Sequence, residues 1–187
     1  SVREFISPGA KPAVGYALTS TWTPLSGEQS DGYLRTDYFD SIAKANVPVI
    51  VVQQDIDKPA NRGAIIGDGM AFQMKALGAV GALVEGNARD IPGIEQAGLP
   101  LWATGRVPGH GPFNMIEHGV TVTVASLTIK PGDILVCDAD GATRVTVDEA
   151  ADVAKMCAEV RAKEGALHKF FSVPDFTPAM WEEWKSK

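Results

Sequence analysis

At 187 residues, the chain has the length of one domain and can bury one sizeable core. Hydrophobic residues make up 45% of it and charged residues 21%, a globular composition that excludes a disordered protein. A formal net charge of -6 without a basic cluster argues against a nucleic-acid partner, and no apolar run is long enough to span a membrane. Because there is no signal peptide and neither Cys137 nor Cys157 has metal-ligand spacing, we expect a cytoplasmic protein with reduced thiols.

The first third of the chain predicts alternating strands and helices. Residues 13–22 (AVGYALTSTW) alternate loosely and contain many β-formers, which indicates a strand. Residues 34–46 have helical spacing and end before Pro48, and residues 47–54 (VPVIVVQQ) form a short apolar run. Such a β-branched run is typical of a strand buried on both faces, so we expect an α/β fold.

The stretch 67–90 (GDGMAFQMKALGAVGALVEGNARD) is predicted to carry the functional site. It combines a turn at 67–69, a helix, a buried strand and the charged pair Arg89-Asp90. The helix offers unpaired backbone N–H groups at its start, which bind carboxylates or phosphates. Residues just past a buried strand commonly carry chemistry in α/β proteins, so the two polar ends of this unit are expected to meet.

The remainder of the chain predicts short elements and an aromatic tail. The elements are a short helix at 91–98, a strand at 100–105, an irregular Gly- and Pro-rich segment at 105–119, one strand at 120–129, a hairpin at 134–147 closed by Asp140-Gly141, and an amphipathic helix from its candidate cap Asp148 to about Lys163. Trp181 and Trp184 share one face of a short C-terminal helix. We therefore expect one catalytic domain over 1–171 and a tail over 172–187 that packs on its own or a neighbouring subunit.

Three motifs together resemble the RraA-like family. They are Gly67-Asp68, Arg89-Asp90 and the PGD…D-DG pattern over 131–141, and the resemblance covers about residues 8–163. The family includes 4-hydroxy-4-methyl-2-oxoglutarate/4-carboxy-4-hydroxy-2-oxoadipate aldolases, whose members often carried the mistaken name demethylmenaquinone methyltransferase. The resemblance implies an αββα sandwich with a β-barrel-like centre, of the swivelling-domain type. It also implies a homotrimer, or a hexamer of two trimers, with active sites at subunit interfaces.

The resemblance assigns roles to the residues of the central unit. The residue that matches Arg89 binds the pyruvyl part of the substrate, and the residue that matches Asp90 ligates Mg²⁺, Mn²⁺ or another divalent cation. The residue that matches Asp68 holds metal-bound water, and the amides of Gly69 and Met70 receive the pyruvate carboxylate. An adjacent subunit is expected to add a carboxylate from its C-terminal region, for which Glu159 and Glu164 are the candidates, and Gly67 completes the substrate-binding turn.

The implied activity is that of a divalent-metal-dependent (class II) pyruvate aldolase, a carbon–carbon lyase. Such an enzyme cleaves a 4-hydroxy-2-oxo acid to pyruvate and a 2-oxo acid through a metal-stabilised enolate, with oxaloacetate decarboxylase side activity. The residue types suit this chemistry, because a cation and a guanidinium both stabilise negative charge that develops on the C2 oxygen. Mg²⁺ prefers oxygen ligands and is often held by only one or two carboxylates.

Simpler interpretations and rival functions remain beside this one. Read from the residues alone, Arg89-Asp90 is also typical of a surface ion pair, and Gly67-Asp68-Gly69 of a turn and helix cap. Several other polar residues are more typical of solvated, turn or core positions than of a site: Lys75, Cys137, Asp138, Asp140, His110, His118 and His168. The rival functions are an RraA-like regulator that inhibits an RNA-degrading endonuclease, and a lyase for another 2-oxo or sugar acid whose pocket walls include Trp102, Arg106 and His110.

Overall fold

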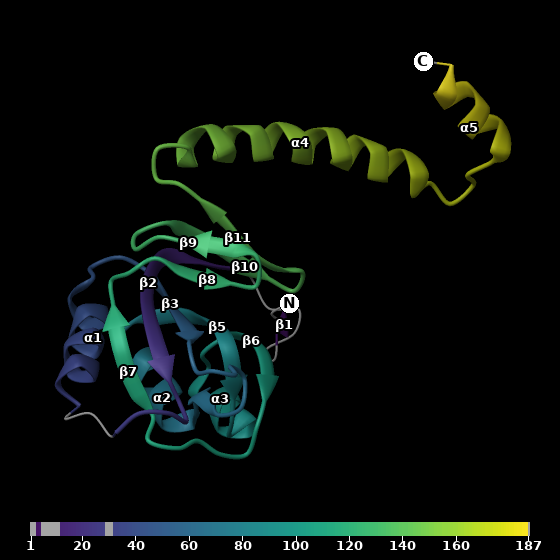
Figure 1. Ribbon diagram of the computed structural model, residues 1–187. Helices are drawn as coiled ribbons and strands as arrows, with labels where there is room; N and C mark the ends of the chain where they lie inside the picture. Colours follow the sequence, from purple (N-terminus) through teal and green to yellow (C-terminus); the bar gives the residue numbers. More distant parts are fainter. Residues whose placement is uncertain (1–2, 5–11, 29–31, 187) are drawn as a thin grey trace. The chain divides into compact units, whose positions relative to one another are not determined.

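The computed structural model describes residues 3–4, 12–28 and 32–186, which form two compact units, Ser1–Val147 and Asp148–Lys187 (Figure 1). The first unit contains, in order, β1 (Arg3–Glu4), β2 (Ala13–Thr23), α1 (Tyr33–Lys44), β3 (Val49–Asp55), β4 (Ala64–Ile66), α2 (Asp68–Ala76), β5 (Ala79–Ala88), α3 (Ile91–Ala97), β6 (Leu101–Arg106), β7 (Asn114–His118), β8 (Val122–Val124), β9 (Leu127–Ile129), β10 (Ile134–Asp138) and β11 (Gly141–Val145). The strand–helix alternation predicted for an α/β fold is confirmed over this unit.

A mixed central sheet organises the first unit. Its strands lie in the order β1-β6-β5-β3-β2-β10-β11, and β2, β3, β5 and β6 run parallel to one another. Strand β2 divides one edge between two antiparallel partners, since residues 13–16 pair with β10 and residues 20–23 pair with β7. The parallel strands point their carboxyl ends to one end of the sheet, where polar residues can gather.

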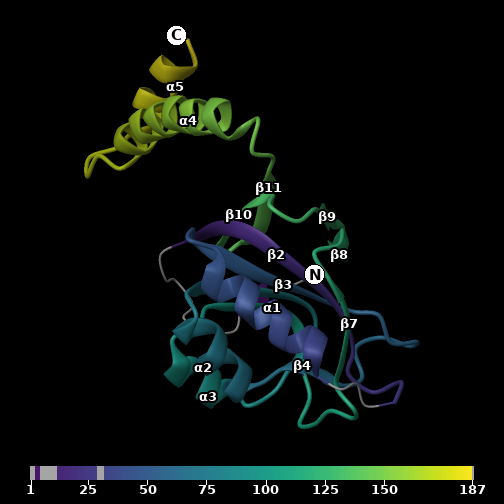
Figure 2. The same cartoon turned by 90° about the vertical axis from the view of Figure 1, so that its left-hand side faces the viewer.

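The central strands are buried on both faces, as the apolar run at 47–54 predicts. Val49 and Val51 pack into a core with α1, α2 and α3, whereas Ile50 and Val52 pack into a second core with the β8–β9 hairpin and β10. Successive side chains of a strand point to opposite faces, so one β-branched run supplies both cores. Figure 2 shows α2 and α3 side by side below α1.

The structure corrects three details of the sequence prediction. The segment 105–119 is not wholly irregular, because β7 pairs with β2. The expected single strand at 120–129 is two short strands joined by a turn in which Ala125 has φ 52°, a conformation that no regular strand adopts. In the last hairpin Asp138 pairs with Gly141, so Asp140 lies in the turn and Gly141 begins β11.

The second unit consists of α4 (Ala150–Phe171) and α5 (Pro178–Lys185). Helix α4 is longer than predicted, and Glu149 rather than Asp148 is its N-cap. An aromatic cluster joins the two helices: Phe170, Phe171, Phe176, Trp181 and Trp184. The shared face of Trp181 and Trp184 is confirmed by their stacked rings, 5.2 Å apart. The boundary at residue 171 stays a prediction about the catalytic domain, and no described helix is long and apolar enough to cross a membrane.

The environment of Cys137 generates a first testable prediction. Its thiol is fully buried in the second core, and burial raises its pKa to about 12, so it stays protonated at neutral pH. In a Cys157→Ser variant, which keeps only this cysteine, we expect a thiol reagent at pH 8 to label no cysteine in the folded protein and one after denaturation. Rapid labelling of the folded variant would contradict this, and the wild type serves as the control because its Cys157 is exposed.

Candidate functional site

The site begins with the pairing of β4 and the end of β5. Strand β4 lies parallel to residues 87–88, and the Arg89 amide donates a hydrogen bond of 3.0 Å to the Ile66 carbonyl. Strand β6 pairs with one edge of β5. Strands β3 and β4 share the opposite edge, where β3 pairs with the first part of β5 and β4 with its end. Two carboxyl ends of strands therefore meet, and the turn at 67–69 comes to lie beside Arg89 and Asp90, as the sequence predicts.

Gly67 lies directly against the charged pair. A Cβ atom at this position would be 3.0 Å from Asp90 Oδ2 and 3.2 Å from Arg89 Nε. The Arg89 Nε and Asp90 Oδ2 atoms are themselves 3.2 Å apart. The φ of Gly67 is -137°, which any residue adopts, so the need for glycine is one of space rather than of backbone freedom.

Asp90 has an unusual backbone for a residue at the start of a helix. It is the N-cap of α3 but lies in the left-handed region, with φ 55° and ψ 40°, and its side chain makes no capping hydrogen bond. Non-glycine residues in this region are uncommon and cluster at functional sites, although aspartate tolerates it better than most. The carboxylate is therefore turned toward Arg89 and the Gly67 turn instead of toward its own helix.

Asp68 is placed by a second glycine. A Cβ atom on Gly93 would lie 2.6 Å from the Cβ of Asp68 and 2.7 Å from its Oδ2. The packing is thus reciprocal: Asp90, at the start of α3, packs against Gly67, and Asp68, at the start of α2, packs against Gly93. Interiors tolerate almost no extra volume, so this reciprocal packing fixes both carboxylates in one region.

The start of α2 presents backbone N–H groups, one of which is already engaged. The first intrahelical bond runs from the Ala71 amide to the Gly67 carbonyl (3.1 Å), so the earlier amides have no partner within the helix. The Gly69 amide donates to Asp68 Oδ1 at 2.6 Å. A substrate carboxylate at this terminus would displace that contact at Gly69 and take the Met70 amide directly.

Most of these residues, but neither Asp90 nor Gly93, line one cavity of about 300 Å³. The turn and the strand end contribute Gly67, Asp68, Gly69, Met70 and Arg89, and the loop after β6 contributes His110, Pro112 and Phe113. The His110 ring is exposed, packs 5.0 Å from the Phe113 ring, and has its Nδ1 2.7 Å from the Gly111 carbonyl. Arg35, from the first turn of α1, also lines the cavity, and no motif in the sequence marks it.

Two of the three predicted pocket walls are wrong for this cavity. Trp102 is 1% exposed in the second core, where its indole N–H donates to the Asp138 carbonyl at 2.7 Å. Arg106 ends β6 and does not line the cavity. The alternation of a strand decides the outcome for Trp102, since a residue that faces the core cannot also face the pocket. His110 is the wall residue that the structure does place there.

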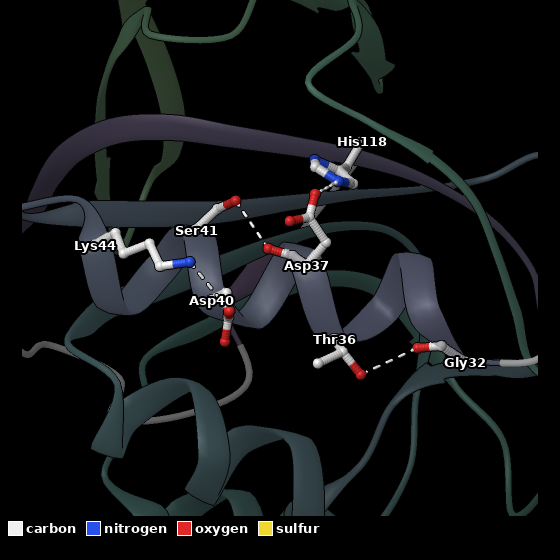
Figure 3. Close-up of polar contacts among 7 residues, drawn as sticks. All are labelled: Gly32, Thr36, Asp37, Asp40, Ser41, Lys44 and His118. Carbon is white, nitrogen blue, oxygen red and sulfur yellow. Dashed lines mark hydrogen bonds and ion pairs between the residues drawn. The ribbon is translucent and has the colours of Figure 1, made fainter.

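The remaining polar candidates of the first unit do not line the cavity. His118, at the end of β7, has its Nε2 2.9 Å from Asp37 Oδ2 on α1 (Figure 3). The Asp138 carboxylate accepts the Asp140 amide at 2.9 Å, which is the turn role expected of both residues. Lys75 is exposed in the last turn of α2. His168, Glu159 and Glu164 are exposed on α4, in the second unit.

The donor set fits a hard divalent cation bound through few protein ligands. Among the described residues, no three His, Cys, Asp or Glu side chains gather closely enough to enclose a metal ion. Asp90 and Asp68 offer carboxylate oxygens on adjoining turns, and Asp90 is 39% exposed at its side chain. Mg²⁺ keeps several waters and commonly takes one or two carboxylates, so this arrangement suits it better than Zn²⁺, which favours His and Cys.

The fold and site define a mixed α/β protein with a cavity of about 300 Å³ at the carboxyl ends of parallel strands. A family model described as "RraA-like: Aldolase/RraA" matches residues 2–144, and the chain belongs to this family. The fold class predicted from the resemblance is confirmed. The structure of Streptomyces coelicolor RraAS2, "an unusual member of the RNase ES inhibitor RraA protein family", superposes with a TM-score of 0.74 at 23% identity over 90% of this chain and 81% of that one.

Two curated relatives are similar in sequence. A protein of Halalkalibacterium halodurans named "Putative 4-hydroxy-4-methyl-2-oxoglutarate aldolase" is 29% identical over 83% of this chain and 78% of its own. The Methanocaldococcus jannaschii protein MJ0644, named uncharacterized, is 24% identical over 64% of this chain. That match spans 58% of the MJ0644 chain, so this chain corresponds to little more than half of that relative's length.

The reciprocal glycine packing generates a second prediction. Gly93→Ala places a methyl group against Asp68, whereas Gly69→Ala places one in open space, with nothing within 4 Å. Both changes gain similar helix propensity, so the difference between them isolates the steric cost. We expect Gly93→Ala to have a free energy of unfolding lower than that of Gly69→Ala by about 1–3 kcal/mol in urea denaturation. Equal stabilities would show that Asp68 is free to move away.

Proposed function

We propose that the protein is a divalent-metal-dependent aldolase that cleaves a 4-hydroxy-2-oxo acid to pyruvate and a second 2-oxo acid. The observation that carries this proposal is the convergence of Arg89, Asp68 and the start of α2 on one cavity, with the Asp90 carboxylate beside it, 3.2 Å from Arg89 Nε. A guanidinium and a helix N-terminus suit a 2-oxo carboxylate, and two nearby carboxylates suit a cation. The aldolase name of the Halalkalibacterium relative supports the same reaction class.

Arg89 and the α2 N-terminus are proposed to hold the end of the substrate that becomes pyruvate. Their backbones are fixed by β4, β5 and the helix, so they are in place before the substrate arrives. As the C3–C4 bond breaks, its electron pair moves to C3 and negative charge develops on the C2 oxygen. The Arg89 guanidinium, which is charged at every physiological pH, is the donor that the chain provides for this charge.

The second requirement of the reaction is removal of the proton from the C4 hydroxyl. As that O–H bond breaks, the C4 oxygen becomes the carbonyl of the departing 2-oxo acid. Asp68, fixed against Gly93, is proposed to hold the water molecule that accepts this proton and then returns it to C3 of the enolate, which gives pyruvate. A divalent cation held by Asp90, and by Asp68 through water, would supply Lewis-acid polarisation of the substrate oxygens. Oxaloacetate decarboxylation is proposed as a side reaction because it develops the same enolate charge.

The quaternary part of the proposal follows the family resemblance. We propose a homotrimer or a pair of trimers, with a carboxylate from the C-terminal region of a neighbour completing the site. Glu159 and Glu164 are the candidates, and both are exposed on α4 and so available to another molecule. Mixing an Arg89→Ala chain with a Glu159→Ala or Glu164→Ala chain tests this arrangement. Recovery of activity in the mixture identifies the trans carboxylate, because only a mixed assembly contains an intact site.

The decisive assay is pyruvate release from a 4-hydroxy-2-oxo diacid and from oxaloacetate, with Mg²⁺ and with EDTA. We expect turnover to require the cation, and Arg89→Ala to lower kcat by about 10²–10³-fold, the usual cost of losing one donor to a developing oxyanion. Asp90→Ala should abolish the metal dependence together with the activity. Lys130→Ala is the matched control, because it removes an exposed cation that does not line the cavity.

A protein that folds but turns over neither compound would overturn the aldolase proposal. The regulator that the sequence leaves open would then be tested directly, by adding the protein to an RNA-degrading endonuclease and measuring RNA cleavage. Inhibition that persists in Arg89→Ala would place regulatory binding outside this cavity.

A further inference from the structure

The cavity is lined by a second arginine, Arg35, which has no role in the proposed chemistry at C2 and C4. Arg35 is the third residue of α1, and it lines the cavity beside Arg89 although α1 and β5 are separate elements. Two guanidinium groups therefore face the same 300 Å³ as a single lining carboxylate, that of Asp68. Arginine is the residue best suited to bind a carboxylate through two parallel hydrogen bonds.

Arg35 is available for a ligand. No carboxylate within the described residues forms an ion pair with it, whereas Lys44, at the other end of the same helix, is paired with Asp40 at 3.1 Å (Figure 3). Its terminal nitrogen lies 4.0 Å from the position that a Cβ on Gly32 would occupy, so the guanidinium lies over the start of α1. The side chain is exposed, and an incoming anion competes with no carboxylate of the described part of the chain.

Arg35 also stands at the junction of two cavities. A second cavity, of about 570 Å³, lies between α1 and α2 and shares Arg35, Gly69 and Met70 with the first. A Cβ atom on Gly69, which lines both cavities, would have nothing within 4 Å. The two cavities therefore adjoin at Arg35 and the start of α2, and the lining of the first contains both Arg89 and Arg35.

We propose that Arg35 is the specificity-determining residue of the site and binds the anionic group at the far end of the substrate. This inference rests on the proposed function, in which Arg89 and the α2 N-terminus hold the 2-oxo carboxylate. With that end of the substrate fixed at Arg89, the group beyond C4 extends past Gly69 to the other guanidinium. The site then selects 4-hydroxy-2-oxo acids that carry a second carboxylate over those that end in a methyl group.

The test compares two substrates that differ only at the distal end, 4-hydroxy-2-oxoglutarate and 4-hydroxy-2-oxopentanoate. Both release pyruvate, so one assay serves for both. In Arg35→Gln, which keeps the helix propensity and much of the length of the side chain, we expect kcat/KM for the diacid to fall by about 10–100-fold, chiefly through KM, as a lost charged hydrogen bond implies. The value for the monoacid should stay within about twofold of the wild type.

Lys44→Gln is the matched control, since it removes a cation from the same helix without lining either cavity. Equal losses on both substrates in Arg35→Gln would overturn the specificity role, and so would an unchanged preference for the diacid. The specificity role is supported if the ratio of kcat/KM for the monoacid to kcat/KM for the diacid rises in Arg35→Gln and stays at the wild-type value in Lys44→Gln.

A binding measurement separates failure of this inference from failure of the aldolase proposal. By isothermal titration, 2-oxoglutarate is expected to bind the wild type more tightly than 2-oxobutyrate, and Arg35→Gln to remove the difference. If the wild type shows this difference but cleaves neither substrate, the aldolase proposal fails and the Arg35 anion site stands. If the two ligands bind equally to the wild type, the Arg35 inference fails whatever the activity.

Discussion

The parallel pairing of β4 with the end of β5 is the constraint on which the rest of the site depends. A three-residue strand and one hydrogen bond, from the Arg89 amide to the Ile66 carbonyl, bring two turns that are more than twenty residues apart in sequence into contact. This pairing places the start of α2 beside Arg89, the Asp90 carboxylate against Gly67, and Asp68 against Gly93. The two cores on either face of β3 and β5 supply the rigidity that so short a pairing needs.

The sequence predicts this half of the molecule well because its signals are local. The β-branched run before Gln53, the glycine-bounded turn at 67–69 and the charged pair after a buried strand each occupy one short window, in which periodicity and turn chemistry are informative. Two of the three motifs that resemble the RraA-like family lie in the same windows, and the family and fold that the motifs indicate are confirmed. The roles of the individual residues stay predictions, since proximity alone does not assign chemistry.

What the sequence could not predict depends on tertiary contacts. Arg35 reaches the cavity only because α1 packs against the sheet next to α2, and nothing in its own window distinguishes it from any surface arginine on a helix. Trp102 belongs to a strand pattern near the site, which suggests a pocket wall, but its face is decided by register with β5, which points it into the second core. Strand β7 escapes prediction for a similar reason, because Gly and Pro precede it and its pairing partner lies about ninety residues earlier.

The reciprocal packing of the two glycines and two aspartates has a consequence for the thermodynamics of ligand binding. Each turn obstructs the movement of the other, so we expect the carboxylates and amides that they carry to lose little conformational entropy when a ligand binds. The opposite wall is built differently, from the exposed His110 loop and the first turn of α1. We therefore expect any loss of conformational entropy on ligand binding to fall mainly on the His110 loop and the first turn of α1, and little of it on α2 and α3.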